Sequence, residues 1–273
     1  MPAQPEGPPP PPTVQRMRLR YTRRGRLRFT SHRDIARVLE RAIRRAGVPI
    51  AFSAGFSPHP KISYVGACPT GVASEAEYLE LGLAEVCDPE WLRGSLDAAL
   101  PPGIDVVAAA VAVPGEASLA ERIDASRWLV RLPGVDLAEL RTAVAAFLDA
   151  ERVAVQRRTK DGFRELDARG PVVSALVHAG VSGAGGDAGC ATLELVVRHA
   201  TPAVRPDDVL AGLQSVALLV PAAPPEATRC AQGLLMGDGE LIDPLAPQPG
   251  LQRLGEQSGI SLGPPGVDRL PGG

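Results

Sequence analysis

The sequence has few aromatic residues, few cysteines and no long hydrophobic run. Phenylalanine, tryptophan and tyrosine make up 4% of its 273 residues, which argues against a single-stranded RNA platform built from many stacked rings. The four cysteines, at positions 68, 87, 190 and 230, form no CxxC or CxxxCxxC motif. Neither a structural zinc site nor an iron–sulfur cluster is therefore expected. No apolar segment reaches the length of a transmembrane helix, so we expect no membrane partner.

The two ends of the chain are rich in proline and glycine. The amino-terminal sequence MPAQPEGPPPPP lacks the charged and apolar regions of a secretory signal peptide, and we expect a cytoplasmic protein. Residues 1–13 are expected to form a disordered proline-rich leader. The composition of residues 237–273 predicts a disordered tail.

Basic residues are concentrated near the start of an otherwise acidic chain. Residues 14–47 contain twelve arginines against two acidic residues, whereas residues 48–151 contain six basic and fifteen acidic residues. Such a basic block indicates a polyanionic partner. The alternative is a solvated helix face in an arginine-rich sequence. The twelve arginines are at positions 16, 18, 20, 23, 24, 26, 28, 33, 37, 41, 44 and 45.

The most regular predicted element is a helix that begins after Ser31. Ser31 is a favourable N-cap, and Asp34 three residues later approximates a capping box. Arginines cover one side, while apolar residues recur at helical spacing on the other. The predicted buried side comprises Ile35, Val38, Leu39, Ala42, Ile43 and Ala46. Gly47 and Pro49 end the helix.

The order of the predicted elements indicates an α+β protein. Residues 14–113 have the order β-α-β-β-α-β of a ferredoxin-like fold, and after a linker at 114–125 the same order is expected over 126–236. The predicted architecture is therefore two ferredoxin-like halves in tandem. Strands are predicted at 17–21, 61–65, 77–83 (with its acidic residues outward), 104–113, 127–132, 153–159, 172–178, 191–199 and 228–235, and further helices at 88–100, 136–150 and 206–216.

Two of the four histidines are candidate catalytic residues. His32 lies at the positive end of the predicted helix, which favours a neutral ring able to act as a base, although a packed histidine at the edge of the buried stripe is an equal alternative. His59 lies in the stiff loop formed by Gly55, Phe56, Pro58 and Pro60, and rigid loops often carry function.

The two candidate histidines could lie across one cleft from each other. With Asp34 or Glu77 they could form an acid–base pair or a metal site, but no HExxH-type spacing specifies this arrangement. His178 and His199 lie on predicted strands without a partner motif, and we expect both to be structural.

A second basic segment contains Arg157, Arg158 and Lys160. It is either the charged tip of a hairpin or a set of phosphate contacts that extends the first basic region across the two halves. Arginine and lysine in this role hold a backbone without reading its sequence.

Four segments, occurring in order, carry a resemblance to a known family. They are LRFTSHRD, RAIRRAGVPIAFSAGFSPHPKIS, GVASEAEYLEL and RRTKDGFRELDAR. Between about Met17 and Leu235 the chain resembles the radical-SAM-associated family of unknown function, in its free-standing actinobacterial form. The resemblance places the motif positions of the family at Arg28, Ser31, His32, Asp34, Gly55, Phe56, Pro58, His59, Pro60, Ser74, Glu77, Tyr78, Asp161, Gly162 and Asp167.

In that family the domain is often fused behind a radical SAM, cobalamin-binding enzyme. Because this chain has no CxxxCxxC motif, the resemblance implies no cofactor in this polypeptide, and a radical SAM partner would carry its own. Genes of the family tend to lie near ribonuclease and ribosomal-protein genes, which implies RNA and a radical SAM or ribonuclease protein as partners.

A second resemblance, at the level of fold alone, is to CRISPR RNA-processing endonucleases with tandem ferredoxin-like halves. An early histidine can serve as the base in such enzymes. By this analogy His32 would activate a 2′-hydroxyl while Arg28 or Arg33 binds the phosphate.

Three functions therefore remain open. The first is an RNA-binding module that holds tRNA or rRNA for a modification or processing enzyme. The second is an RNA-processing or RNA-modifying enzyme that uses His32 and His59, and the third is a subunit that docks an acidic protein. The expected nucleic-acid contacts are Arg28, Arg33, Arg37, Arg41, Arg44, Arg157, Arg158 and Lys160.

Overall fold

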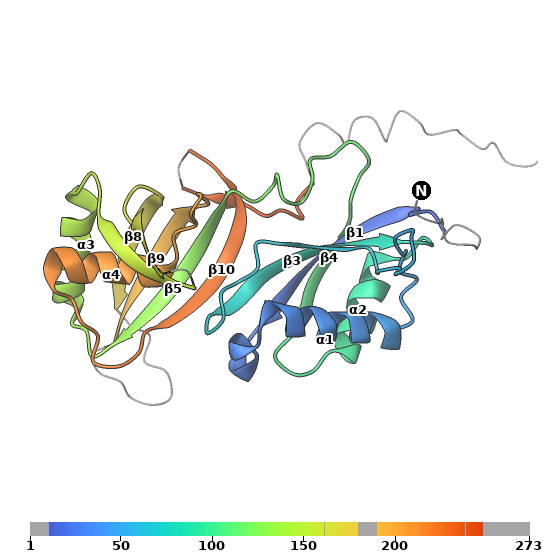
Figure 1. The fold of residues 1–273 in the computed structure, drawn as a ribbon, viewed down its shortest axis with the longest axis horizontal. Helices are drawn as coiled ribbons and strands as arrows, with labels where there is room; N and C mark the ends of the chain where they lie inside the picture. Colours follow the sequence, from blue (N-terminus) through green and yellow to red (C-terminus); the bar gives the residue numbers. More distant parts are fainter. Residues whose placement is uncertain (1–10, 161, 180–189, 238, 248–273) are drawn as a thin grey trace, which may run out of the picture.

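The computed structural model describes residues 11–160, 162–179, 190–237 and 239–247. In these residues the chain forms four α-helices, one short 3-10 helix, a mixed sheet of nine strands and a separate sheet of two strands (Figure 1). The α+β class is the one that the sequence predicts. No helix in the described ranges is long and apolar enough to cross a lipid bilayer.

The first part of the chain forms one half of the large sheet and its two covering helices. Its elements are β1 (Gln15–Arg23), η1 (Gly25–Phe29), α1 (His32–Arg45), β2 (Ile62–Val65), β3 (Ala73–Leu83), α2 (Pro89–Ala99) and β4 (Val106–Val111). Strand β1 pairs antiparallel with both β3 and β4, and β2 pairs antiparallel with β3. The strand order is therefore β4-β1-β3-β2.

The second part repeats this pairing pattern with an insertion. Its elements are β5 (Ala125–Pro133), α3 (Leu137–Asp149), β6 (Ala154–Thr159), β7 (Gly162–Asp167), β8 (Val172–Ala179), β9 (Cys190–Arg198), α4 (Pro206–Ala217), β10 (Glu226–Leu235) and β11 (Leu241–Ile242). The order is β10-β5-β9-β8. Strands β6 and β7 form a hairpin outside the large sheet. The sequence predicts β6 but not β7.

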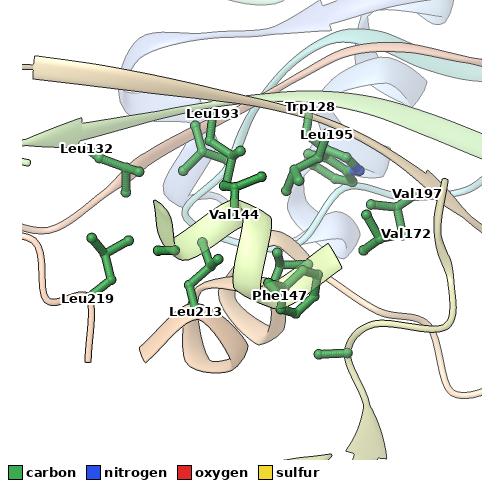
Figure 2. Close-up of a cluster of buried hydrophobic side chains, with 14 of the residues drawn as sticks. Trp128, Leu132, Val144, Phe147, Val172, Leu193, Leu195, Val197, Leu213 and Leu219 are labelled. Carbon is green, nitrogen blue, oxygen red and sulfur yellow. The ribbon is translucent and has the colours of Figure 1, made fainter. Parts of the chain in front are cut away.

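Each half has its own hydrophobic core between its helices and one face of the sheet. In the second half, Val144 and Phe147 of α3 and Leu213 of α4 gather against Leu193 and Leu195 of β9 (Figure 2). The two helices lie close together at Gly212, where a Cβ atom would be 2.7 Å from the Phe147 ring. Glycine is therefore the residue that fits this contact.

The two halves share a short parallel ladder between β3 and β10. Thr228 pairs with Ala73, and Arg229 pairs with Ser74. Because these two pairs join strands from opposite ends of the sequence, the two halves form a single continuous sheet (Figure 1).

Segments predicted to be a linker and a tail pack against the first half. Leu119 and Ile123, from the predicted linker, are buried in a small cluster with Tyr78. Residues 241–242 add β11 to β10, and Asp243 forms a 3.1 Å ion pair with Arg20 of β1. Residues 239–247, within the predicted tail, thus contact the fold. Of the predicted leader at 1–13, residues 11–13 are described, and the Thr13 hydroxyl accepts a 3.0 Å hydrogen bond from Lys61. Residues 1–10 of the leader and residues 238 and 248–273 of the tail lie outside the described residues.

Candidate nucleic-acid interface

Helix α1 begins where the sequence predicts, with Ser31 as its N-cap. The Ser31 hydroxyl accepts a 3.2 Å hydrogen bond from the Asp34 backbone N–H and donates a 2.7 Å bond to the Asp34 carboxylate. The Ser31 hydrogen bond and the nearby Arg37 guanidinium lower the pKa of Asp34. The resulting negative charge lies at the positive end of the helix, where it is favourable. Ile35 and Leu39 are buried, which fixes the orientation of the helix.

The side of α1 away from the core forms what we call the arginine face, comprising Arg33, Arg37, Arg41 and Arg44. All four side chains are exposed. Arg37 forms a 3.1 Å ion pair with Asp34. Within the described residues, Arg33, Arg41 and Arg44 have no acidic group within ion-pair distance. Their charges are therefore available to an external partner.

A shallow cavity borders the arginine face between α1 and the end of α2. It has a volume of about 330 Å³, and its lining includes Arg41, Leu100 and Pro101. Arg45 donates a 3.2 Å hydrogen bond to the Ala99 carbonyl, so its guanidinium also lies at this boundary. A basic surface with an apolar hollow can contact both the charged and the apolar parts of a ligand.

The 3-10 helix η1 adds two arginines and an exposed ring beside the start of α1. The Arg28 guanidinium carbon lies 4.8 Å from the centroid of the Phe29 ring, within the range of a cation–π interaction. The Arg28 carbonyl accepts a 2.7 Å hydrogen bond from Gly71, which ties η1 to the loop before β3. Arg26 is exposed, and in the described ranges it has no acidic partner within ion-pair distance.

His32 lies at the surface and not in the buried stripe. Its side chain is exposed, and its ring meets the Tyr64 ring edge to face, with centroids 5.1 Å apart. Burial and the nearby Glu40 carboxylate raise the pKa of Tyr64, so the phenol stays protonated at neutral pH. His32 therefore packs against Tyr64 at the edge of the buried stripe while its side chain stays exposed.

His59 lies in an exposed loop in which the backbone of His59 is hydrogen-bonded to Ser53. Ser53 donates its backbone N–H to the His59 carbonyl at 2.9 Å, and the Ser53 hydroxyl accepts from the His59 N–H at 3.0 Å. The other motif positions of this loop, Gly55, Phe56, Pro58 and Pro60, lie at or near the surface. Gly55 has a positive φ of 123°, which glycine adopts without strain.

In the described residues His32 and His59 share no hydrogen bond and no ring contact: the His32 ring contacts Tyr64, and the backbone of His59 is hydrogen-bonded to Ser53. In the described part of the chain, no group of three or more histidine, cysteine, aspartate or glutamate side chains could hold a metal ion.

Glu77 is buried in a polar cluster at the junction of the two halves, although its strand is predicted to turn its acidic residues outward. It forms an ion pair with Arg229 of β10, and both side chains are 4% exposed. Arg229 also donates a 3.0 Å hydrogen bond to Gln232 and lies 5.5 Å from the Trp128 ring. Since buried charges require partners, Glu77 and Arg229 compensate each other at the junction and are not available to a ligand.

The same cluster extends through Arg23 and Cys68. Arg23 is 2% exposed and donates to the carbonyls of Cys68, Pro69 and Val72. The Cys68 N–H donates a 3.2 Å hydrogen bond to Glu77. Burial raises the pKa of the Cys68 thiol to about 11, so the thiol is protonated and unreactive at neutral pH.

The three basic residues of the predicted second basic segment lie in the β6–β7 hairpin in two different environments, one bonded within the fold and two exposed. Arg157 donates from Nε to Asp208 of α4 at 2.9 Å and from a second nitrogen to the Ala203 carbonyl at 2.7 Å. Its guanidinium therefore anchors the hairpin within the fold. Arg158 and Lys160 are exposed, and Arg158 lies directly opposite Phe163.

Asp167 holds the end of this hairpin. One carboxylate oxygen accepts from the N–H groups of Val153 and Arg169 at 3.1 and 3.0 Å, and the other accepts from Gly170 at 3.2 Å. Asp167 thus has a structural role in the hairpin. Asp161 lies outside the described residues.

A serine–histidine pair that the sequence does not single out lies near β5. The Ser126 hydroxyl and the His199 Nε2 atom are 2.7 Å apart, and Ser126 is 1% exposed. Burial and the nearby Arg229 lower the pKa of His199, which favours a neutral ring. Because Ser126 is inaccessible, the pair satisfies its own polar groups and does not form an open nucleophile site.

The fold and this surface define an α+β protein with an exposed basic helix at one end of a continuous mixed sheet. The chain belongs to the DUF2344 family, described as uncharacterized proteins conserved in bacteria, whose match covers residues 16–206. A comparison with curated proteins finds no match. The family match includes α1, η1 and Glu77 but ends before Arg229 of β10.

Proposed function

We propose that this protein is an RNA-binding accessory module that holds tRNA or rRNA for modification or processing. The observation that carries the proposal is the arginine face, where Arg33, Arg41 and Arg44 have no acidic partner within the described residues. Planar guanidinium groups bind phosphates with paired hydrogen bonds. Arginines held on a rigid helix position a nucleic-acid backbone without selecting its sequence.

The proposed architecture is two ferredoxin-like halves in tandem. Its support is the pairing order, β4-β1-β3-β2 in the first half and β10-β5-β9-β8 in the second, with two helices in each. The β6–β7 hairpin would then be an insertion after the first helix of the second half. Fold alone does not specify function, so the RNA proposal depends on the surface residues.

The proposed protein partner is a radical SAM enzyme or a ribonuclease in the cytoplasm. The support is the resemblance of the sequence motifs to the radical-SAM-associated family. In this arrangement the partner contributes the chemistry and any cofactor, while the arginine face holds the substrate.

The test compares two triple variants with equal change in charge. The first is Arg33→Gln/Arg41→Gln/Arg44→Gln. The control is Arg93→Gln/Arg131→Gln/Arg152→Gln, in which each arginine is ion-paired with a glutamate. Affinity for total tRNA and for rRNA fragments is measured by fluorescence anisotropy at several salt concentrations.

The first variant should bind roughly 50-fold more weakly near 0.15 M salt, and its log–log salt slope should fall by about 2 in magnitude. The control should bind like the wild type. Equal losses in both variants would show that net charge alone matters. Absence of RNA binding by the wild type would overturn the proposal and direct the search to an acidic protein partner.

A further inference from the structure

Most of the few phenylalanines in this protein are at the surface. The sequence has five phenylalanines, and only Phe147 is buried in a core. The exposed fractions of Phe29, Phe52, Phe56 and Phe163 are 60%, 41%, 71% and 76%. Phenylalanine is usually buried, so the exposure of these four rings requires an explanation. The low aromatic content of the sequence gives no indication that they are exposed.

Phe29 is the exposed ring that lies nearest along the chain to the arginine face, four residues before Arg33. It ends η1, three residues before α1, and Arg28 packs against it at 4.8 Å. Arg26 and Arg33, on either side of the ring in sequence, are both exposed. Phe29 therefore combines an open aromatic surface with cations on either side along the chain.

Arg28 is held at this ring by few other contacts. Its Nε atom is buried and has no hydrogen-bond partner in the described residues, and its Nη1 atom is 3.9 Å from Glu226 of β10. The guanidinium therefore contacts both the Phe29 ring and, at the ion-pair limit, the Glu226 carboxylate.

We propose that the RNA bound at this surface is single-stranded, and that one of its bases stacks on Phe29. The inference rests on the proposed function and specifies its ligand. Unpaired bases stack on exposed aromatic rings while the backbone follows a basic groove or surface. In an A-form duplex the base faces are covered by neighbouring pairs, so a duplex cannot use the ring in this way.

The experiment measures binding of the full chain to a 12-nucleotide RNA, free or annealed to its complement. Phe29→Ala should weaken binding of the single strand by about 10-fold and leave binding of the duplex nearly unchanged. Phe29→Trp should retain the wild-type affinity because it preserves a stacking surface. The salt slope should be the same in all three proteins, since stacking releases no counterions.

Phe56→Ala is the matched control. Phe56 is 71% exposed but makes no cation–π contact among the described residues, so its removal should leave both affinities unchanged. The thermal unfolding midpoint of each variant should equal that of the wild type, because all the altered rings are exposed.

The outcomes separate this inference from the proposed function. If Phe29→Ala binds the single strand as well as the wild type does, or if the wild type prefers the duplex, stacking is overturned while RNA binding stands. If the wild type binds neither form, the proposed function itself fails.

Discussion

The arginines of β1 and the arginines of α1 come from one basic block, but the fold uses them in opposite ways. In β1, Arg18 is 4% exposed at its side chain and is ion-paired with Glu80 and Glu116 at 3.1 and 3.0 Å. In α1, Arg33 and Arg44 are exposed, with no acidic group within ion-pair distance in the described residues. Buried, ion-paired arginines such as Arg18 hold the structure together, and arginines that are exposed and unpaired within the described residues, such as Arg33 and Arg44, are available to a ligand.

This comparison shows why the number of arginines in the sequence overstates the positive charge that is exposed and unpaired on the surface. Arg20 and Arg24 are also ion-paired within the fold, with Asp243 at 3.1 Å and with Asp105 at 2.7 Å, although their side chains remain 36% and 47% exposed. A buried cation such as Arg18 has lost its water and requires compensation inside the protein, whereas an exposed cation keeps its hydration until a phosphate displaces it. Three comparisons between variants can break or sharpen this distinction.

The largest expected effect is that of Arg18→Ala. The substitution leaves the carboxylate of Glu116, which is 6% exposed, with Arg122 at 3.4 Å as its remaining basic partner, and it removes a 2.7 Å hydrogen bond to the Ala117 carbonyl. We expect the free energy of unfolding to fall by about 3–5 kcal/mol, measured by urea denaturation. The control Arg41→Ala should change it by no more than about 0.5 kcal/mol. Equal effects of the two variants would contradict the division between structural and available arginines.

The second prediction applies the comparison to two neighbouring residues, Arg157 and Arg158. Arg157 binds Asp208, which is 5% exposed, whereas Arg158 is on the outer face of the hairpin. Arg157→Ala should lower the free energy of unfolding by about 2–3 kcal/mol, because it removes hydrogen bonds between charged groups. Arg158→Ala should leave stability unchanged and reduce the affinity for long RNA if the hairpin contacts it. A loss of stability in both variants would show that the hairpin has no free arginine.

The local parts of this architecture can be predicted from the sequence. The N-cap at Ser31, the buried stripe that contains Ile35 and Leu39, and the exposed arginines of α1 all follow from the spacing of residues within one helix. Most strands of the large sheet can be predicted from apolar patterns that likewise span only a few residues. These features depend on neighbours along the chain, which a sequence displays directly.

The pairing of distant residues cannot be predicted in this way. Glu77 and Arg229 meet because β10 returns to β3 from the far end of the chain. Alternation within β1 indicates that Arg18 points outward, but the segment near Ala117 folds over that face and buries the side chain. The sequence therefore predicts which arginines of α1 are exposed, but it does not predict which arginines of β1 are buried.

The smallest expected effect concerns the pH dependence of stability, through His199. The folded protein holds the pKa of this ring below its ordinary value, mainly by burial and also by the charge of Arg229. The unfolded chain takes up a proton near pH 6.5 while the folded ring stays neutral, so the unfolded state binds more protons. The stability that His199 contributes is therefore complete above pH 6.5 and decreases as the pH falls toward the pKa of the folded ring.

The measurement is a series of urea unfolding curves between pH 5 and pH 8 on the wild type, His199→Gln and His32→Gln. Replacement of His199 should flatten this part of the profile. The His32 ring is exposed, and its one ring contact among the described residues is the edge-to-face contact with Tyr64. Replacement of His32 should therefore leave the profile as it is in the wild type. If His32→Gln flattens the profile instead, the surface histidine is coupled to folding. The distinction between side chains that bond within the fold and side chains that are free for a partner would then hold for the arginines and not for the histidines.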